Sequence, residues 1–447
     1  MDTGDLQKQA VAIMAAWVRR LRQLGPARIA VFSIFIAVFW QIPIAYAQIQ
    51  HGEWTTFFED KINQLRKTEL RVIVLDEADH PVQGATVHVS QLAHSFELGY
   101  AIDGRNLAND LNQPPLKVFN SISLEHLSNW SRLQAKPDTQ PADDMLLEQA
   151  LCAALQRGMT IRWGVALSAD MGRNPDWLVP LQAQHLQGAI DSHIDRIVRQ
   201  YCGRLDQVDV YGYLTSHSMV EERLGLPMLR RMFERAKAAC PELALGVRFD
   251  NGLSGRQGNE VYKKIMAMKE LQVHFDYVAI DQKYSGKVSH VRILGGVKRM
   301  EHVPAPVYIS GLEVGGDNMV EAAINMDTVL RLLFAQANVH GIWFTGLRAD
   351  ELAEPNAALL DDEGGLTAIG NVVERLFGEL WWSEHQDVTD ELGNVNHHVF
   401  AGRYHISAEL DGRIINETQL WLPISDQSRV VVLQPYKQEP ISPEQGD

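Results

Sequence analysis

Residues 306–346 read PVYISGLEVGGDNMVEAAINMDTVLRLLFAQANVHGIWFTG. Their apolar residues form a short run at 306–311, a longer stretch with helical period at 319–338 and a second short run at 340–346. Short apolar runs of this length are typical of buried strands, and the longer amphipathic stretch is typical of a helix. The segment therefore predicts one strand–helix–strand unit of an α/β fold.

The same alternation of short apolar runs and helical stretches extends from residue 96 to residue 380. The predicted strands are 96–101, 119–124, 160–167, 207–211, 244–249, 275–280, 306–311 and 340–346. The predicted helices are 144–157, 185–203, 225–239, 257–272, 287–301, 319–338 and 366–380. Eight strands with intervening helices predict a (β/α)8 TIM barrel over 96–380, with a doubly wound sheet as the alternative.

Two segments that flank the predicted barrel have a different pattern. Residues 70–91 contain two alternating strands joined by a polar turn, which predicts a hairpin within a small N-terminal β module at 48–95. After Trp381 the helical period disappears, and we expect a small C-terminal β domain at 381–436. The polar residues 437–447 are expected to form a flexible tail.

The first 47 residues carry a pattern of export. A basic segment precedes the apolar run Ile29–Trp40, and Ala45-Tyr46-Ala47 follows it. This order is typical of a signal peptide with a small-residue cleavage site. The apolar stretch 29–47 would also suit an uncleaved membrane anchor. Both alternatives predict a periplasmic or extracellular body, with membrane contact only through 29–47.

Charge and cysteine content restrict the function classes. The 447 residues include 41 Lys and Arg against 56 Asp and Glu, a formal net charge of −15, which argues against a nucleic-acid partner. Cys152, Cys202 and Cys240 stand in apolar surroundings that favour buried thiols, although an oxidising compartment could pair two of them. No Cys or His cluster has zinc spacing, and we expect no metal or other cofactor.

Several ordered segments resemble one enzyme family. The stretches at 66–76, 81–89 and 94–101 are similar to the entry into the barrels of glycoside hydrolase family 10, the xylanase family. Further similarities follow in order along residues 66–380. They are Phe119-Asn120 with Trp130 downstream, Asn174-Pro-Asp-Trp-Leu178, Val208-Asp-Val210, Pro306-Val-Tyr-Ile-Ser310 and Gly341-Ile-Trp-Phe-Thr-Gly-Leu347. The resemblance implies a TIM barrel and retaining hydrolysis of a β-linked polysaccharide.

That chemistry requires two carboxyl groups about 5–5.5 Å apart, one as acid/base and one as nucleophile. The family motif for the acid/base glutamate matches 208–213 and places Tyr213 at that position. The motif for the nucleophile matches 310–313 and places Gly311 there. Glycine has no nucleophile, and a tyrosine with a pKa near 10 is a poor acid at neutral pH. The resemblance therefore implies a barrel without the family's catalytic pair.

These replacements favour a protein without catalytic activity. One hypothesis is carbohydrate binding around the cleft, with a polysaccharide or oligosaccharide as ligand. Its candidate contact residues are His126, Trp130, Trp163, Trp177 and Tyr213. The tryptophans could equally pack in the core, and His126 could have a structural role. The second hypothesis is a scaffold in the cell envelope with a protein or membrane-complex partner.

An active glycoside hydrolase with relocated carboxylates is the alternative. Acidic residues at the predicted strand ends would have to supply the catalytic pair. They are Glu125, Asp170, Asp281, Glu313 and Asp350. Each of them could also be a solvated loop residue, since sequence does not show whether two of them face each other.

Overall fold

The computed structural model describes residues 54–107, 117–137, 144–214, 219–253, 255–425 and 427–435. The predicted export segment 1–47 and the predicted tail 437–447 lie outside these residues. The chain divides into two units, 1–60 and 61–447, of which the first contributes helical residues 54–60 to the description. Among the described residues, no helix combines the length and the apolar content needed to cross a bilayer.

Eight parallel strands form a closed barrel in the second unit. The strands follow the chain, and the last one pairs with the first, so that Gly341 lies opposite Glu97. They are β3 (Glu97–Ala101), β4 (Ser121–Ser123), β5 (Thr160–Ser168), β6 (Gln207–Gly212), β7 (Ala244–Asp250), β8 (Tyr277–Tyr284), β9 (Val307–Val314) and β10 (Val339–Phe344). The predicted (β/α)8 barrel is confirmed.

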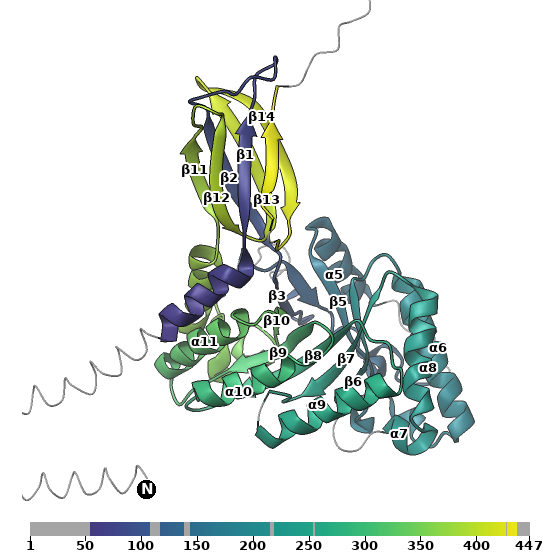
Figure 1. Ribbon diagram of the computed structural model, residues 1–447. Helices are drawn as coiled ribbons and strands as arrows, with labels where there is room; N and C mark the ends of the chain where they lie inside the picture. Colours follow the sequence, from purple (N-terminus) through teal and green to yellow (C-terminus); the bar gives the residue numbers. More distant parts are fainter. Residues whose placement is uncertain are drawn as a thin grey trace, which may run out of the picture. The chain divides into compact units, whose positions relative to one another are not determined.

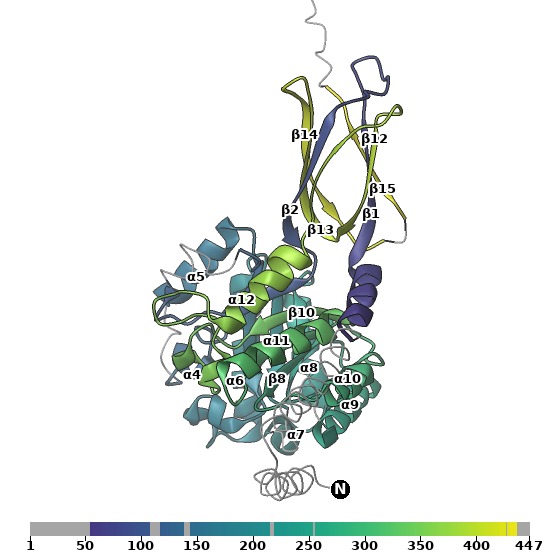
Figure 2. The ribbon, with the colours of Figure 1, turned by 90° about the vertical axis from the view of Figure 1, so that its left-hand side faces the viewer.

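Helices follow the strands as predicted, with two short helices, at 130–133 and 219–224, that were not predicted. They are α4 (Trp130–Leu133), α5 (Met145–Gln156), α6 (Ala183–Tyr201), α7 (Met219–Leu224), α8 (Pro227–Ala239), α9 (Gly255–Glu270), α10 (His290–Met300), α11 (Met319–Phe334) and α12 (Ala368–Glu374), which continues as a π-helical turn over Arg375–Leu380. Local sequence fixes their starts: the Asn318 side chain accepts from the backbone N–H groups of Val320 and Glu321 and caps α11. Figure 2 shows α10, α11 and α12 over the strands of the barrel.

The remaining strands form two packed sheets. One sheet has the order β12 (Asn394–Phe400), β1 (Lys67–Val74) and β15 (Arg429–Leu433). The other has the order β11 (Glu384–Val388), β2 (Thr86–His94), β13 (Gly402–Leu410) and β14 (Arg413–Leu422). Figure 1 shows the purple strand β1 among the green and yellow strands of the C-terminal part, and Figure 2 separates β2 and β14 from β12 and β15.

This sandwich corrects two predictions. The N-terminal β module and the C-terminal β domain are one structure, because β1 and β2 pair with strands from residues 384–433. The predicted hairpin is wrong as well, since β1 and β2 belong to different sheets. Their alternating pattern has a physical reason: Val72 and Val74 of β1 and Val87 and Val89 of β2 bury their side chains in the common core.

A disulfide joins Cys202, just after α6, to Cys240, just after α8, with their Cα atoms 5.7 Å apart. Cys152 is a free, exposed thiol. The preference for buried free thiols is therefore wrong for all three. The apolar neighbours of these cysteines belong to the buried faces of helices, and such a local pattern does not show which helix ends meet.

Candidate active site

The mouth of the barrel is organised around Arg248 of β7. This guanidinium is 2% exposed and donates from Nη1 to Glu125 Oε2 at 2.6 Å. It also donates from Nε and Nη2 to the two oxygens of Asp281, at 2.7 and 2.9 Å. Gly164 of β5 leaves room for the Glu125 backbone, because it has a φ of +96° and a Cβ there would lie 2.9 Å from the Glu125 Cα. A bidentate Arg–carboxylate pair is among the stronger polar contacts in proteins.

A second buried ion pair lies below the first. Asp209 of β6 binds the Arg162 guanidinium and accepts from the Tyr277 hydroxyl at 2.9 Å. Arg248 Nη1 is 3.8 Å from Asp209 Oδ2, so the two pairs form one cluster of three carboxylates and two guanidinium groups. Asp209 and Arg162 are 0% exposed. Buried charges of this kind persist only when they compensate one another.

Tyr213 occupies the position that the family resemblance assigns to the acid. Its backbone has a φ of +56°, a left-handed conformation that is uncommon for a bulky residue. The phenol donates to Glu125, and the Arg173 guanidinium lies 3.8 Å from the ring centroid. Burial raises the pKa of Tyr213 well above its usual value. The phenol therefore holds its proton and cannot act as the acid at neutral pH.

Gly311 occupies the position that the family resemblance assigns to the nucleophile, and the space beside it is filled. A Cβ at Gly311 would lie 2.9 Å from Asp281 Oδ1 and 3.4 Å from Arg248 Nη2. Ser310 Oγ donates to the same Asp281 oxygen at 2.8 Å. A glutamate at residue 311 would therefore collide with the Arg248–Asp281 pair. The buried cluster has taken the volume that a nucleophile would need.

The structure brings two of the five candidate carboxylates together. Glu125 and Asp281 bind opposite sides of the Arg248 guanidinium. Burial raises the pKa of Glu125, but the Arg248 charge and the hydrogen bonds from Tyr213 and Arg248 outweigh burial and lower the pKa to about 2. Burial raises the pKa of Asp281. Two carboxyl groups with pKa values shifted in opposite directions are typical of glycosidases, yet here a cation fills the space between them.

The other three candidate carboxylates have structural contacts. Asp350 forms an exposed ion pair of 2.6 Å with Arg105. Asp170 accepts from the backbone N–H of Gly172 and caps a short 3-10 turn. Glu313 is 1% exposed, accepts from the backbone N–H groups of Ala353 and Glu354 and lies 2.7 Å from Lys283 Nζ.

The predicted sugar-stacking tryptophans are largely buried. Trp163 is 0% exposed, and Trp130 is 2% exposed with its ring stacked on His193 at a centroid distance of 3.7 Å. Burial leaves Trp163 no face for a sugar, whereas Trp130 keeps a small exposed part of its side chain in the lining of a cavity at the mouth of the barrel. Trp177 is partly exposed and donates from Nε1 to the Gln134 carbonyl at 3.0 Å. His126 is exposed at the rim, with Nε2 3.3 Å from the Thr345 carbonyl oxygen.

A cavity of about 530 Å³ remains beside the buried cluster. Glu125, His126, Arg173, Asn174 and Tyr213 contribute to its wall. Ligand-binding pockets typically have volumes of about 300–1,000 Å³, so this cavity has room for a small ligand.

One group of potential metal ligands also meets among the described residues, at Cys202, Cys240 and Glu242. Its two sulfurs form the disulfide, so they are not free to bind a metal.

Sequence reasoning missed Arg162, Asp209 and Arg248. Each of them is a single charged residue inside an otherwise apolar strand, at Ile161-Arg-Trp163, Val208-Asp-Val210 and Val247-Arg-Phe249. A charge in a strand that is buried on both faces requires a partner. This signal was present in the sequence and indicated a buried ionic cluster, although it did not identify the partners.

A further acid, partly buried, lies near the amino end of the barrel strands. Glu97 of β3 accepts from Gln207 Nε2 at 2.9 Å and from the Tyr308 hydroxyl at 3.3 Å. Burial raises the pKa of Glu97 to about 7. The folded chain therefore holds this proton more tightly than the unfolded chain, whose glutamate has a pKa near 4.5. This contribution to stability is full below about pH 4.5 and is lost as the pH rises through about 7.

Glu97→Gln should therefore stabilise the protein increasingly between pH 5 and pH 8. The expected gain at pH 8 relative to pH 5 is about 2–3 kcal/mol in the free energy of unfolding, from the size of the pKa shift. Denaturant titrations of both proteins at a series of pH values measure it. Glu301→Gln, at an exposed helix end, is the matched control. An equal effect of Glu97→Gln at both pH values would contradict the raised pKa.

Comparison with known proteins gives one family and several structures. The model of glycosyl hydrolase family 10 matches residues 89–359. The anti-sigma-I factor RsgI6 of Acetivibrio thermocellus is 22% identical over 363 residues, which cover 81% of this chain and 47% of that protein. Endo-1,4-beta-xylanase 1 of Arabidopsis thaliana is 22% identical over 353 residues, covering 76% of this chain and 36% of that protein. The chain thus spans less than half the length of these curated relatives.

Solved xylanase structures share the fold. Xylanase 10B from Thermotoga petrophila, in complex with xylobiose, superposes with a TM-score of 0.56 at 15% identity, covering 64% of this chain and 95% of that chain. Xylanase 10B from Thermotoga maritima gives a TM-score of 0.55 at 18% identity, with coverage of 64% and 97%. At these identities the likeness concerns the fold, and it accounts for the barrel.

Proposed function

Since the chain belongs to glycosyl hydrolase family 10, we propose that it is an exported member without hydrolytic activity that binds a polysaccharide or oligosaccharide. The observation that carries this proposal is the position of Arg248. Its guanidinium lies between Glu125 and Asp281, where a retaining hydrolase needs a sugar ring between two carboxyl groups. Tyr213 and Gly311 stand at the family's catalytic positions and supply neither acid nor nucleophile.

The cavity at the mouth supports a binding role. It is lined by groups that hydrogen-bond well to hydroxyls, including His126 and Arg173. One of the solved structures with this fold is a xylanase in complex with xylobiose. One relative over most of this chain is named as an anti-sigma factor rather than as an enzyme. These observations favour a barrel that recognises a glycan without cleaving it.

Export is part of the proposal. The pattern of residues 1–47 favours a signal peptide or an anchor, and the Cys202–Cys240 disulfide suits an oxidising compartment. We therefore place the barrel and sandwich in the periplasm or outside the cell.

A scaffold role with an envelope protein partner is the second candidate, and it is favoured by the filling of the catalytic positions with a buried ionic cluster.

The full-length chain should release no reducing sugar from xylan or from other β-glycans above the level of its Glu125→Gln variant. The reason is that Arg248 excludes a sugar ring from the space between the carboxyl groups. A reducing-end assay over a long incubation measures this, with circular dichroism to confirm that the variant is folded. Turnover by the native chain that Glu125→Gln or Asp281→Asn abolishes would establish the alternative, a hydrolase with relocated carboxylates.

Binding is tested separately by calorimetric titration with xylohexaose. His126→Ala should weaken binding about fivefold to tenfold, since an exposed hydrogen-bonding group at the cavity wall is lost. His185→Ala, at an exposed position of α6, is the matched control and should leave affinity unchanged. Absence of binding by the folded native chain would favour the scaffold role.

A further inference from the structure

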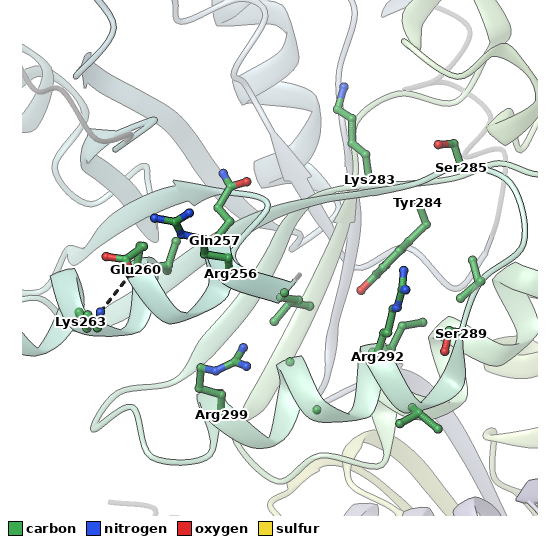
Figure 3. Close-up of a pocket in the computed structure, with 18 of the residues that line it drawn as sticks. Arg256, Gln257, Glu260, Lys263, Lys283, Tyr284, Ser285, Ser289, Arg292 and Arg299 are labelled. Carbon is green, nitrogen blue, oxygen red and sulfur yellow. Dashed lines mark hydrogen bonds and ion pairs between the residues drawn. The ribbon is translucent and has the colours of Figure 1, made fainter. Parts of the chain in front are cut away.

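A second and larger cavity lies between α9 and α10, next to the end of β8. Its volume is about 1480 Å³, and it shares no lining residue with the cavity at the mouth of the barrel. Figure 3 shows Arg256 and Gln257 of α9 on one side, Arg292 and Arg299 of α10 on the other, and Lys283 and Tyr284 at the end of the strand. We call this cavity the α9–α10 groove.

The α9–α10 groove is strongly cationic in an acidic protein. Seven of its 22 lining residues are Lys or Arg and one is acidic, whereas the chain as a whole has 41 basic and 56 acidic residues. The seven are Arg256, Lys263, Lys264, Lys283, Lys287, Arg292 and Arg299. Clustered charge of one sign in a concave surface concentrates ligands of the opposite charge.

Three of these cations have carboxylate partners and three do not. Lys263, Lys264 and Lys283 lie 3.1, 3.2 and 2.7 Å from glutamate oxygens. Arg256, Lys287 and Arg292 are exposed, and no described residue forms a hydrogen bond or ion pair with their side chains. In a chain with an excess of acids, these cations are left available to an external anion.

Two buried polar atoms of residues that line the groove have no hydrogen-bond partner among the described residues. They are Arg299 Nη1 and Tyr284 Oη. Gly258 leaves room for this guanidinium, because a Cβ there would lie 2.7 Å from Arg299 Nη1. A buried polar atom without a partner costs about 1–3 kcal/mol. Both atoms are enclosed by protein, so they show that the wall of the groove is short of acceptors and are not themselves contacts for a ligand.

We propose that the α9–α10 groove binds an acidic oligosaccharide, through the carboxylates of its uronate units. This inference rests on the proposed polysaccharide binding and names the kind of glycan. The cations are spread over two helices and a strand end, so they suit charges spaced along a chain. Val288 and Val291 also line the groove and provide apolar surface for the C–H faces of sugar rings.

Other anions fit the groove less well. A single phosphate or sulfate group would be held by cations that converge on one point, whereas Arg256 and Arg292 come from different helices and line a groove of about 1480 Å³. An acidic peptide offers carboxylates but has backbone N–H groups that need acceptors, and the groove has one acidic side chain, Glu260, already bound to Lys263. An acidic oligosaccharide brings carboxylate oxygens to the three exposed cations without adding such N–H groups.

Calorimetric titration of the full chain with two matched ligands tests the proposal. The ligands are xylohexaose and the same hexaose carrying glucuronate side groups, so that they differ only in their acidic substituents. We expect the acidic ligand to bind at least tenfold more tightly at low ionic strength. The difference should shrink as salt is added, because the cations are exposed and screened.

Variants locate the effect in the groove. Lys287→Gln with Arg292→Gln should weaken binding of the acidic ligand about tenfold and leave xylohexaose unaffected. Both residues are exposed, so the fold should tolerate the changes. Lys269→Gln is the matched control, since it removes an exposed cation of α9 outside the groove.

Three results would overturn the inference. They are equal affinity for the two hexaoses, equal loss in the Lys269→Gln control, and equally tight binding of hexaglutamate or of inorganic phosphate. The first two results would show that the groove does not recognise uronates, and the third would show that it binds anions in general. Release of reducing sugar, or absence of xylohexaose binding, would count against the proposed function. The comparison of the acidic and neutral ligands would still test the groove in either case.

Discussion

Arg248→Met should lower the free energy of unfolding by about 3–5 kcal/mol, because it removes one partner from a buried ionic cluster. Glu125 and Asp281 would then lose the cation that both contact, and Asp209 would keep Arg162 as its one cation beside the Tyr277 hydroxyl. A buried carboxylate without a counter-charge raises its pKa to become neutral, so the loss should be smaller at pH 4 than at pH 8. Denaturant titration at both pH values measures the effect.

Two further variants test whether the loss of stability comes from the ionic cluster or from packing in general. Arg199→Met removes an exposed arginine of α6 and should change stability by less than about 0.5 kcal/mol. Combining Arg248→Met with Glu125→Gln and Asp281→Asn should restore at least half of the lost stability, since the uncompensated charges are gone. If Arg248→Met is tolerated like the surface control, the cluster does not organise the mouth of the barrel.

Loss of the Cys202–Cys240 disulfide should lower the free energy of unfolding by about 3–4 kcal/mol. The bond closes a loop with a sequence separation of 38 residues, and the estimate follows from the chain entropy that such a loop removes from the unfolded state. Thermal or denaturant unfolding with and without reductant measures the difference. Cys202→Ser should reproduce the reduced protein, because Cys202 is only partly buried and serine fits there.

Cys152→Ser is the control for this experiment. Its thiol is exposed and free, so the variant should match the native chain in oxidising buffer and respond to reductant in the same way. Equal stability of the native chain with and without reductant would contradict the stabilising role of the disulfide. It would also remove one of the observations that support export.

The barrel could be predicted because its signal is local and repeated. Buried parallel strands give short apolar runs and the helices between them give amphipathic stretches, so a run of eight such units leaves little choice of fold. The sandwich had no such signal. The alternation in 67–74 shows which face of β1 is buried, but its partners are β12 and β15 at the other end of the chain, and sequence separation hides that pairing.

The candidate site was predictable only in part. Motif spacing identified Tyr213 and Gly311 at the positions that the family resemblance assigns to the catalytic pair. The predicted strand ends included Glu125 and Asp281 among the candidate carboxylates. Neither signal indicated that Arg248 joins the last two, because a contact between strands depends on the three-dimensional register. The tryptophans show the same limit: Trp130 and Trp163 resemble sugar platforms in sequence, while their burial is decided by His193 and by neighbouring strands.

The sandwich combines strands from both ends of the sequence, and this determines the order in which the protein can fold during synthesis. Lys67 pairs with Phe400, and Leu70 pairs with Arg429, so the first strands of the chain obtain their neighbours only after the whole barrel segment has been synthesised. Until then β1 and β2 have open edges that can pair with other chains. A nascent chain that stalls before residue 384 would expose the edges of β1 and β2. Whether such a chain aggregates would depend on what covers these edges.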